Sequence, residues 1–346
     1  MAQSFLARNW KLLVGIASFI VVQEVLQRRK FIDLQGQVVL ITGSSRGFGL
    51  AMAEEFTRWG AKLIICARED VELERARQHL AEMGADVLAV RCDVTDMEEV
   101  QNLIHQATQR FGRIDILVNN AGIISVGPWQ TLTRRDFEHS MDIIFWGTYN
   151  VTMAVLPQMT ERKSGRIVNI ASIGGKVSVP HLLSYSTAKF AVEGFSAGMH
   201  AELARENIVG TTVSPGLMRT GSPVNVNVKG QDHRQEYTLF ALADALPGFS
   251  IAARRAARQV VNATRRGDTE LIITIPAQLA ARLHGALPGL ITDLMAVVNR
   301  LLPSGEGQGT ALYRGKDSET PISQSFLTKL SQRASEKYNE YSNNEK

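Results

Sequence analysis

The sequence predicts an α/β protein built on a doubly wound parallel sheet, and two observations lead to this prediction. Short apolar runs rich in Val and Ile alternate with longer stretches of helical spacing from residue 37 onward. Most of these runs lack strict apolar–polar alternation, which is typical of strands buried on both faces of a parallel sheet. Alternating strand and helix units of this length favour right-handed crossovers within a single domain.

Seven apolar runs are the predicted strands, covering residues 38–42, 62–67, 86–93, 114–120, 166–172, 210–216 and 270–275. Stretches of helical spacing over residues 48–59, 71–83 and 97–111 are each followed by a glycine. A glycine directly after the last periodic residue is a common helix stop, so we expect a helix in each interval.

Composition and charge narrow the class of protein. The 346 residues are 45% hydrophobic and 21% charged, which is sufficient for a sizeable core. The net charge of +4 comes from scattered basic residues and gives no reason to expect a nucleic-acid partner. Both cysteines, Cys66 and Cys92, lie in apolar runs, so we expect buried free thiols and a reducing compartment.

The N-terminal segment, residues 1–30, contains an uncharged apolar run over residues 12–22. This run is shorter than the roughly 20 apolar residues that a membrane span requires, and no cleavage site of the A-x-A type follows it. An uncleaved anchor, an interfacial helix and a helix packed on the protein itself remain open. We expect membrane association through residues 10–27. The basic residues 28–30 favour a cytoplasmic position for the rest of the chain, either beside a membrane or free in the cytoplasm.

The catalytic domain is expected to cover residues 36–276. Within it, residues 217–250 interrupt the alternation and look loop-like, either as a substrate lid or as a tolerated surface insertion. Residues 277–303 form an amphipathic helical extension, broken near Pro288, which would pack on the sheet or on a partner subunit. Residues 304–346 are polar and predict a partly disordered tail.

A glycine-rich turn, residues 42–49 (TGSSRGFG), lies between the first predicted strand and the first helix. Glycines in such a turn permit a tight bend, close approach of a pyrophosphate to the backbone, and close packing of helix and strand. The helix N-terminus then faces the negative phosphates. This placement therefore predicts a dinucleotide site.

Several motifs in order resemble the short-chain dehydrogenase/reductase family, over residues 36–276, which implies a Rossmann fold and a nicotinamide cofactor. They are TGSSRGFG, Asp93-Val94, Asn119-Asn120-Ala121-Gly122, Ser172 with Tyr185 and Lys189, and Pro215-Gly216 with Thr220. In the family the Asp contacts adenine, the Asn motif supports the sheet and lines the cofactor, and the Thr contacts the nicotinamide amide. The cofactor residues implied are Gly43, Ser45, Arg46, Gly47, Phe48, Gly49, Arg68, Asp93, Val94, Asn120, Ala121, Gly122, Tyr185, Lys189, Pro215, Gly216 and Thr220.

The second predicted strand indicates which nicotinamide cofactor binds. An acid at its end would hold the ribose diol and repel a 2′-phosphate, but Ala67 occupies that position and Arg68 follows. Arg46 lies inside the glycine loop, and two guanidinium groups suit a phosphate. Glu69 and Asp70 are expected to begin the next helix, where acids are favoured. The sequence therefore predicts NADP(H) rather than NAD(H).

Tyr185 and Lys189 are four residues apart, which places them on one face of a helix. A nearby ammonium lowers the pKa of a phenol, so Tyr185 can exchange a proton with a substrate oxygen. The resemblance implies that Lys189 also holds the nicotinamide ribose and that Ser172 hydrogen-bonds the reacting oxygen. These three residues are the predicted catalytic set, and no metal is expected.

One position departs from the family pattern. Ile144 stands where the family has an Asn that supports a water linking the lysine to solvent, so the proton relay is in doubt. Asn150 lies six residues further on and should face elsewhere, so it does not take over this role.

These features predict an NADP(H)-dependent oxidoreductase that interconverts a ketone or aldehyde with an alcohol, in a homo-oligomer. Apolar residues around the predicted site indicate a small hydrophobic substrate: Ile123, Ile124, Val177, Val179, Leu182 and Leu183. The alternative is a catalytically weak NADP(H)-binding sensor or structural protein, which Ile144 motivates.

Overall fold

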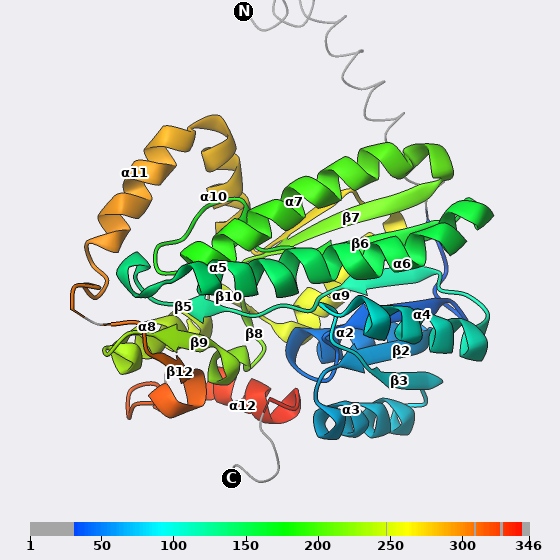
Figure 1. Cartoon of the computed structure of the whole chain (residues 1–346), viewed down its shortest axis with the longest axis horizontal. Helices are drawn as coiled ribbons and strands as arrows, with labels where there is room; N and C mark the ends of the chain where they lie inside the picture. Colours follow the sequence, from blue (N-terminus) through cyan, green and yellow to red (C-terminus); the bar gives the residue numbers. More distant parts are fainter. Residues whose placement is uncertain (1–30, 247, 308, 326–327, 341–346) are drawn as a thin grey trace, which may run out of the picture.

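Seven parallel strands form the central sheet of the described residues, in the order β11-β7-β6-β4-β1-β2-β3. Strands β7, β6, β2 and β3 of this sheet are labelled in Figure 1. The computed structural model describes residues 31–340 except 247, 308 and 326–327. The strands are β1 Val38–Thr42, β2 Lys62–Ala67, β3 Val87–Arg91, β4 Ile116–Asn119, β6 Gly165–Ile170, β7 Ile208–Pro215 and β11 Glu270–Ile273. Each corresponds to one of the predicted runs, so the prediction of a doubly wound parallel sheet is confirmed.

Strand β1 shows why the apolar runs do not alternate with polar residues. Val39 and Ile41 face one core cluster, whereas Val38 and Leu40 face a second cluster on the opposite side of the sheet. Both faces of the strand are therefore buried, and every position along it is apolar until Thr42.

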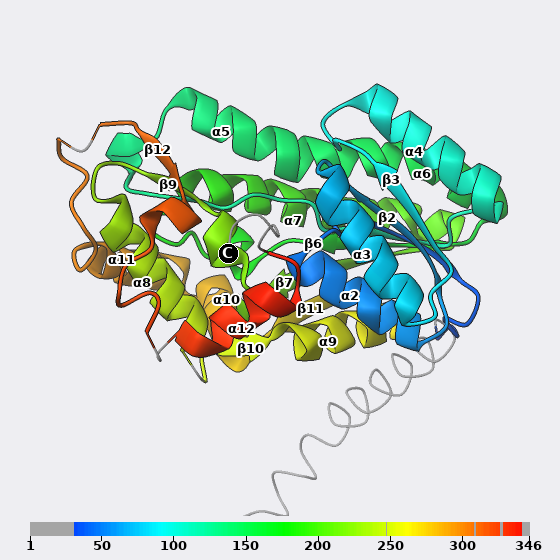
Figure 2. The same ribbon diagram turned by 90° about the horizontal axis from the view of Figure 1, so that it is seen from below.

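Helices cover both faces of the sheet (Figure 2). One core cluster contains side chains of α2 (Gly47–Arg58), α3 (Asp70–Glu82) and α9 (Ala253–Arg266). The other contains side chains of α4 (Met97–Phe111) and α6 (Gly147–Arg162), with Leu203 at the end of α7 (Leu183–Leu203). The three helices predicted from the sequence are confirmed to within one residue at each end.

Strand order reverses between β1 and β4. The chain proceeds from β1 to β2 and β3 on one side, and then continues with β4, β6, β7 and β11 on the other. Ligands of open α/β sheets bind outside the carboxyl ends of the strands at such a reversal. The glycine-rich turn after β1 lies at this position.

The loop-like interpretation of residues 217–250 is wrong. This segment contains β8 (Leu217–Arg219), β9 (Asn227–Lys229) and α8 (His233–Ala245), and it ends at the start of β10 (Ser250–Ala252). The alternation VNVNV is the period-two pattern of a half-buried strand. Val226 and Val228 pack with Tyr237 of α8 in a separate core cluster, whereas Val224 lies in a 3-10 turn, Ser222–Asn225. A role as a substrate lid stays a prediction.

The predicted helical extension contains α10 (Ile275–Ala286) and α11 (Pro288–Asn299), which meet at the expected break. Large apolar side chains remain exposed along both helices, at Ile275, Leu279, Leu283, Leu287, Leu290, Leu294 and Val297. Ile291 is the buried residue of α11, so the described structure does not show this stripe packed on the sheet.

The described part of residues 304–346 differs from the expected polar tail. It contains β12 (Leu312–Arg314) and α12 (Lys329–Lys337), and Tyr338 joins the core cluster around α2. The boundaries of 36–276, 277–303 and 304–346 remain predictions. The apolar run over residues 12–22 lies outside the described residues. Within the part of the chain that is described, no helix has both the length and the apolar character needed to cross a membrane.

Candidate active site

The three glycines of the turn after β1 have different surroundings. Gly43 has a φ of 60°, and a Cβ on it would lie 2.8 Å from the Ala121 backbone. A Cβ on Gly49 would lie 2.2 Å from the Gly43 carbonyl, so both positions need glycine for close packing. Gly47, with a φ of 57°, begins α2, and a Cβ there would meet only the Glu340 carboxylate. We therefore expect an anion such as a cofactor phosphate to approach the backbone of the turn at Gly47.

The Asn120-Ala121 segment after β4 is hydrogen-bonded to the glycine turn. The Thr42 hydroxyl accepts hydrogen bonds from the backbone N–H groups of Asn120 (2.9 Å) and Ala121 (3.0 Å). The Asn120 side chain donates to the Thr42 and Gly43 carbonyls at 3.0 and 2.9 Å. Two motifs that are almost 80 residues apart are thereby held together at the reversal of strand order.

Arg46 and Arg68 both lie near the glycine turn, and each has an acidic neighbour. Arg46 Nη1 lies 2.9 Å from Glu72 Oε1, and Arg68 Nη1 lies 3.8 Å from Asp93 Oδ2. Ala67 is the last residue of β2, so the position at which the family can carry an acid is apolar. Glu69 caps α3 and Asp70 begins it, as the sequence predicts.

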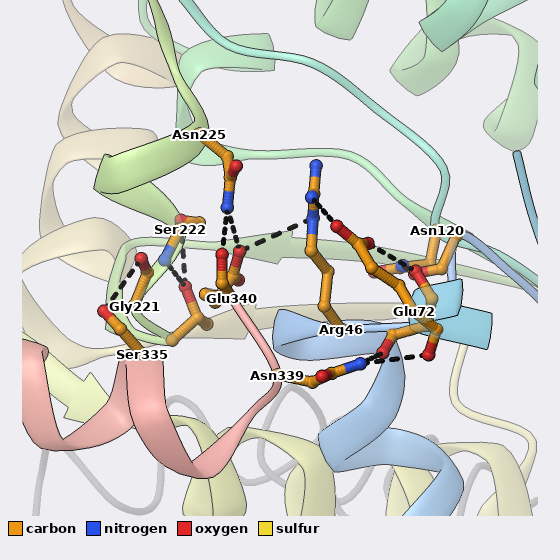
Figure 3. Close-up of polar contacts among 12 residues, drawn as sticks. Arg46, Glu72, Asn120, Gly221, Ser222, Asn225, Ser335, Asn339 and Glu340 are labelled. Atoms are coloured by element: carbon orange, nitrogen blue, oxygen red, sulfur yellow. Dashed lines mark hydrogen bonds and ion pairs between the residues drawn. The ribbon is translucent and has the colours of Figure 1, made fainter. Parts of the chain in front are cut away.

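Four polar residues at the glycine turn were not predicted from the sequence: Glu72, Asn225, Asn339 and Glu340 (Figure 3). Glu72 is in the first turn of α3, where an acid is ordinary, so its contact with Arg46 had no local signal. Asn339 donates from Nδ2 to the Ser45 carbonyl at 2.8 Å, and Asn225 donates to the Glu340 carboxylate at 2.7 Å. Burial raises the pKa of the Glu340 carboxyl to about 7, against the lowering effect of Arg46.

Ser172, Tyr185 and Lys189 converge beside Gly174. A Cβ on Gly174 would lie 3.2 Å from Cε1 of Tyr185 and 3.5 Å from Oγ of Ser172. Lys189 Nζ lies 5.8 Å from the centroid of the Tyr185 ring. Ser172 follows β6, while Tyr185 and Lys189 are one turn apart on α7. The structure therefore brings the predicted catalytic residues together.

Burial dominates the ionisation of this cluster. Burial raises the pKa of Tyr185, and a hydrogen bond with the Ser172 side chain acts in the opposite direction. Burial lowers the pKa of Lys189 to about 8, while the charge of Glu193 acts to raise it. Lys189 Nζ donates a hydrogen bond to the Ile170 carbonyl at 2.7 Å. Near neutral pH the phenol is therefore protonated and the ammonium is largely charged.

Ile144 lies beside Lys189, which is where the family resemblance places the Asn that Ile144 replaces. A Cβ on Gly122 would be 3.8 Å from both Ile144 Cγ1 and Lys189 Nζ. Ile144 is 1% exposed and belongs to a π-helical turn, Asp142–Trp146. Asn150 donates instead to the Val94 carbonyl at 3.1 Å, away from the lysine.

The remaining predicted residues lie at the ends of β3 and β7. Asp93 accepts hydrogen bonds from the Thr95 backbone and hydroxyl, at 2.9 and 2.8 Å. Pro215 ends β7, and Thr220 is buried with its hydroxyl donating to Ser222 at 2.9 Å. Gly216 is tightly packed, since a Cβ there would lie 2.4 Å from the Thr274 hydroxyl.

A family model described as short chain dehydrogenase matches residues 37–230. The chain belongs to the short-chain dehydrogenase/reductase family. Members of this family are oxidoreductases that bind a nicotinamide cofactor and act on CH–OH groups. The geometry of the glycine turn fits such a cofactor, because the glycine at Gly47 leaves room for an acidic group at the N-terminus of α2, a space that the Glu340 carboxyl occupies.

Relatives of this short-chain dehydrogenase/reductase include two insect proteins named dehydrogenase/reductase SDR family protein 7-like. The one from Anopheles gambiae is 38% identical over 58% of this chain and 64% of its own length, just under two thirds. The one from Drosophila melanogaster is 30% identical over 82% of this chain and 87% of its own. A crystal structure of an actinorhodin polyketide ketoreductase with NADPH has a TM-score of 0.62 and 30% identity, covering 69% of this chain and 96% of that one.

Proposed function

We propose that the protein is an NADP(H)-dependent reductase that interconverts a hydrophobic ketone or aldehyde with its alcohol. The observation that carries the proposal is the cluster of Ser172, Tyr185 and Lys189, with a partly buried phenol and a buried ammonium beside a dinucleotide turn. Proton transfer at the substrate oxygen is the chemistry that such a phenol can perform.

The bound cofactor supplies or accepts the hydride at the substrate carbon. Tyr185 donates its phenolic proton to the carbonyl oxygen during reduction, and its raised pKa keeps that proton in place at neutral pH. Ser172 orients the same oxygen by a hydrogen bond. Lys189 stabilises the phenolate that remains, because its ammonium lies 5.8 Å from the ring in a buried site where charges interact strongly.

Cofactor preference follows from the residues around β2. Ala67 leaves no carboxylate to repel a 2′-phosphate, and the guanidinium groups of Arg46 and Arg68 flank the turn. Glu72 pairs with Arg46 and Asp93 pairs with Arg68. A phosphate would compete with these two carboxylates for the guanidinium groups, because it accepts two hydrogen bonds from one guanidinium. The NADPH in the related ketoreductase agrees with this preference.

A hydrophobic substrate is supported by apolar side chains around Tyr185, which packs against the core cluster of Ile144, Ala171, Ala188 and Val192. Val177 is buried near the catalytic serine, and Ile124 and Leu182 pack against the cluster formed by β9 and α8. Leu183 begins α7 and is exposed. The related crystal structure is that of a polyketide ketoreductase, and the name of that enzyme specifies a ketone substrate.

The alternative function, a weak or inactive NADP(H)-binding sensor, is favoured by one observation. Ile144 places an apolar side chain beside Lys189 and gives the ammonium no hydrogen-bond partner from that direction. Lys189 nevertheless donates to the Ile170 carbonyl, so its charge is held without an Asn.

A substrate screen separates the two functions. Purified protein is incubated with NADPH and ketones of increasing chain length and ring count, and absorbance at the nicotinamide band is followed. We expect steady NADPH consumption that improves with hydrophobic bulk. NADPH binding without consumption of any ketone would support the sensor instead.

A further inference from the structure

The last described residues of the chain, Tyr338–Glu340, lie directly on the glycine turn (Figure 3). The backbone N–H of Gly47 donates to the Tyr338 carbonyl at 2.9 Å. Asn339 Nδ2 donates to the carbonyls of Ser45 and Glu72, at 2.8 and 3.0 Å. The first donor of α2 and the outer edge of the turn are thus occupied by the chain itself.

Glu340 places a carboxyl group where a phosphate is expected. Its Oε1 lies 2.5 Å from the position that a Cβ on Gly47 would have, in the gap that glycine leaves open. Its Oε2 lies 3.5 Å from Arg46 Nε. The N-terminus of a helix and a glycine without a side chain together form the setting in which an α/β fold binds pyrophosphate.

We propose that residues 339–340 compete with the nicotinamide cofactor for the glycine turn and must leave before the cofactor binds. This inference rests on the family's dinucleotide site and does not depend on the choice of NADPH over NADH or on the substrate. The Glu340 carboxyl and a pyrophosphate cannot share the space beside Gly47, and the ionised form of the carboxyl also repels the phosphates. The segment therefore acts as an autoinhibitory contact.

The anchoring of α12 allows such a movement. A Cβ on Gly221 would lie 2.3 Å from the Ser335 backbone, and the Ser335 hydroxyl donates to the Gly221 carbonyl at 3.1 Å. Ser331 of the same helix donates to Asp244 of α8 at 3.0 Å. These contacts do not involve the glycine turn, so residues 339–340 can detach after Tyr338 while α12 remains in place.

The two residues after Tyr338 are the more readily detached part. Tyr338 is buried in the core cluster around α2, whereas Asn339 and Glu340 make mainly polar contacts that water or a phosphate can replace. Substituting these two residues therefore tests the competition while leaving the apolar packing of Tyr338 intact.

The test compares the dissociation constants of NADPH and NADH for the full chain and three variants, by fluorescence titration. A segment docked nine tenths of the time would weaken binding by about tenfold. We expect the double variant Asn339→Ala with Glu340→Ala to lower the dissociation constants of both cofactors by about that factor, since both cofactors carry the pyrophosphate. Glu340→Gln, which keeps the shape but removes the charge, should give a smaller gain of the same sign. Glu336→Gln, the same change on the exposed side of α12, is the matched control and should change neither constant.

Unchanged dissociation constants for both cofactors in the double variant and in Glu340→Gln would overturn the competition. Circular dichroism checks that each variant is folded, and Glu340→Gln decides the matter if the double variant is not. Equal affinity for NADPH and NADH would contradict the proposed cofactor preference and would leave the competition standing. The two failures are therefore distinguishable.

Discussion

Reduction should weaken as the pH rises through the pKa of Lys189. Burial holds this pKa at about 8, so the ammonium is about nine tenths protonated at pH 7 and about one tenth at pH 9. If only the charged form stabilises the phenolate of Tyr185 and holds the cofactor ribose, activity should fall about tenfold over that interval. The sign follows because the active form of the lysine carries the proton.

The measurement is kcat/KM for NADPH with the ketone saturating, since this parameter reports ionisations of the enzyme before the cofactor binds. A matched variant strengthens the assignment. The Glu193 charge acts to raise the pKa of Lys189, so Glu193→Gln should move the alkaline midpoint to lower pH. Ser214 and Lys176 donate to different oxygens of the Glu193 carboxylate, and the glutamine keeps one oxygen that can accept from one of them.

A profile that stays flat between pH 7 and pH 9 would show that the lysine charge does not limit the reaction. A midpoint that moves upward in Glu193→Gln would refute the electrostatic reasoning even if the profile declines.

Three further predictions follow from particular residues. Arg46→Ala should weaken the binding of NADPH by about tenfold or more and the binding of NADH much less, because a charged hydrogen bond contributes about 1.5–3 kcal/mol. Equal losses of affinity for the two cofactors would contradict the assignment of Arg46 to the 2′-phosphate. Ile144→Asn should raise turnover or shift its pH profile if proton supply is limiting, and should lower the melting temperature because a buried amide without partners costs about 1–3 kcal/mol; unchanged kinetics would show that the relay does not limit the rate. Deleting residues 1–30 should move the protein from the membrane fraction to the soluble fraction with NADPH binding retained, and a freely soluble full chain would contradict the anchor interpretation.

The sheet and the catalytic cluster were predictable because their signals are local. The valine- and isoleucine-rich runs report burial on both faces, and Val38–Ile41 of β1 do face two different core clusters. The four-residue spacing of Tyr185 and Lys189 fixes them on one face of α7 whatever surrounds that helix.

What escaped prediction depends on contacts between distant parts of the chain. Asn339 bonds to Ser45 across 294 positions, and nothing near either residue indicates this. The VNVNV alternation was a strand signal, but its apolar partners lie in β5 (Ser125–Val126) and α8. Polar composition predicted disorder beyond residue 303, whereas Tyr338 packs into the core. Local composition therefore indicates the elements but does not say which of them lie on the site.

The catalytic role of Tyr185 is tested most directly by Tyr185→Phe, assayed for ketone reduction and for NADPH binding. The substitution removes the phenolic proton and keeps the ring, so packing against Gly174 is preserved. We expect turnover to fall at least about 100-fold, the lower end of what a positioned acid contributes, while the NADPH dissociation constant changes little. Near-normal turnover of Tyr185→Phe on a ketone that the full chain reduces well would contradict the proposed mechanism.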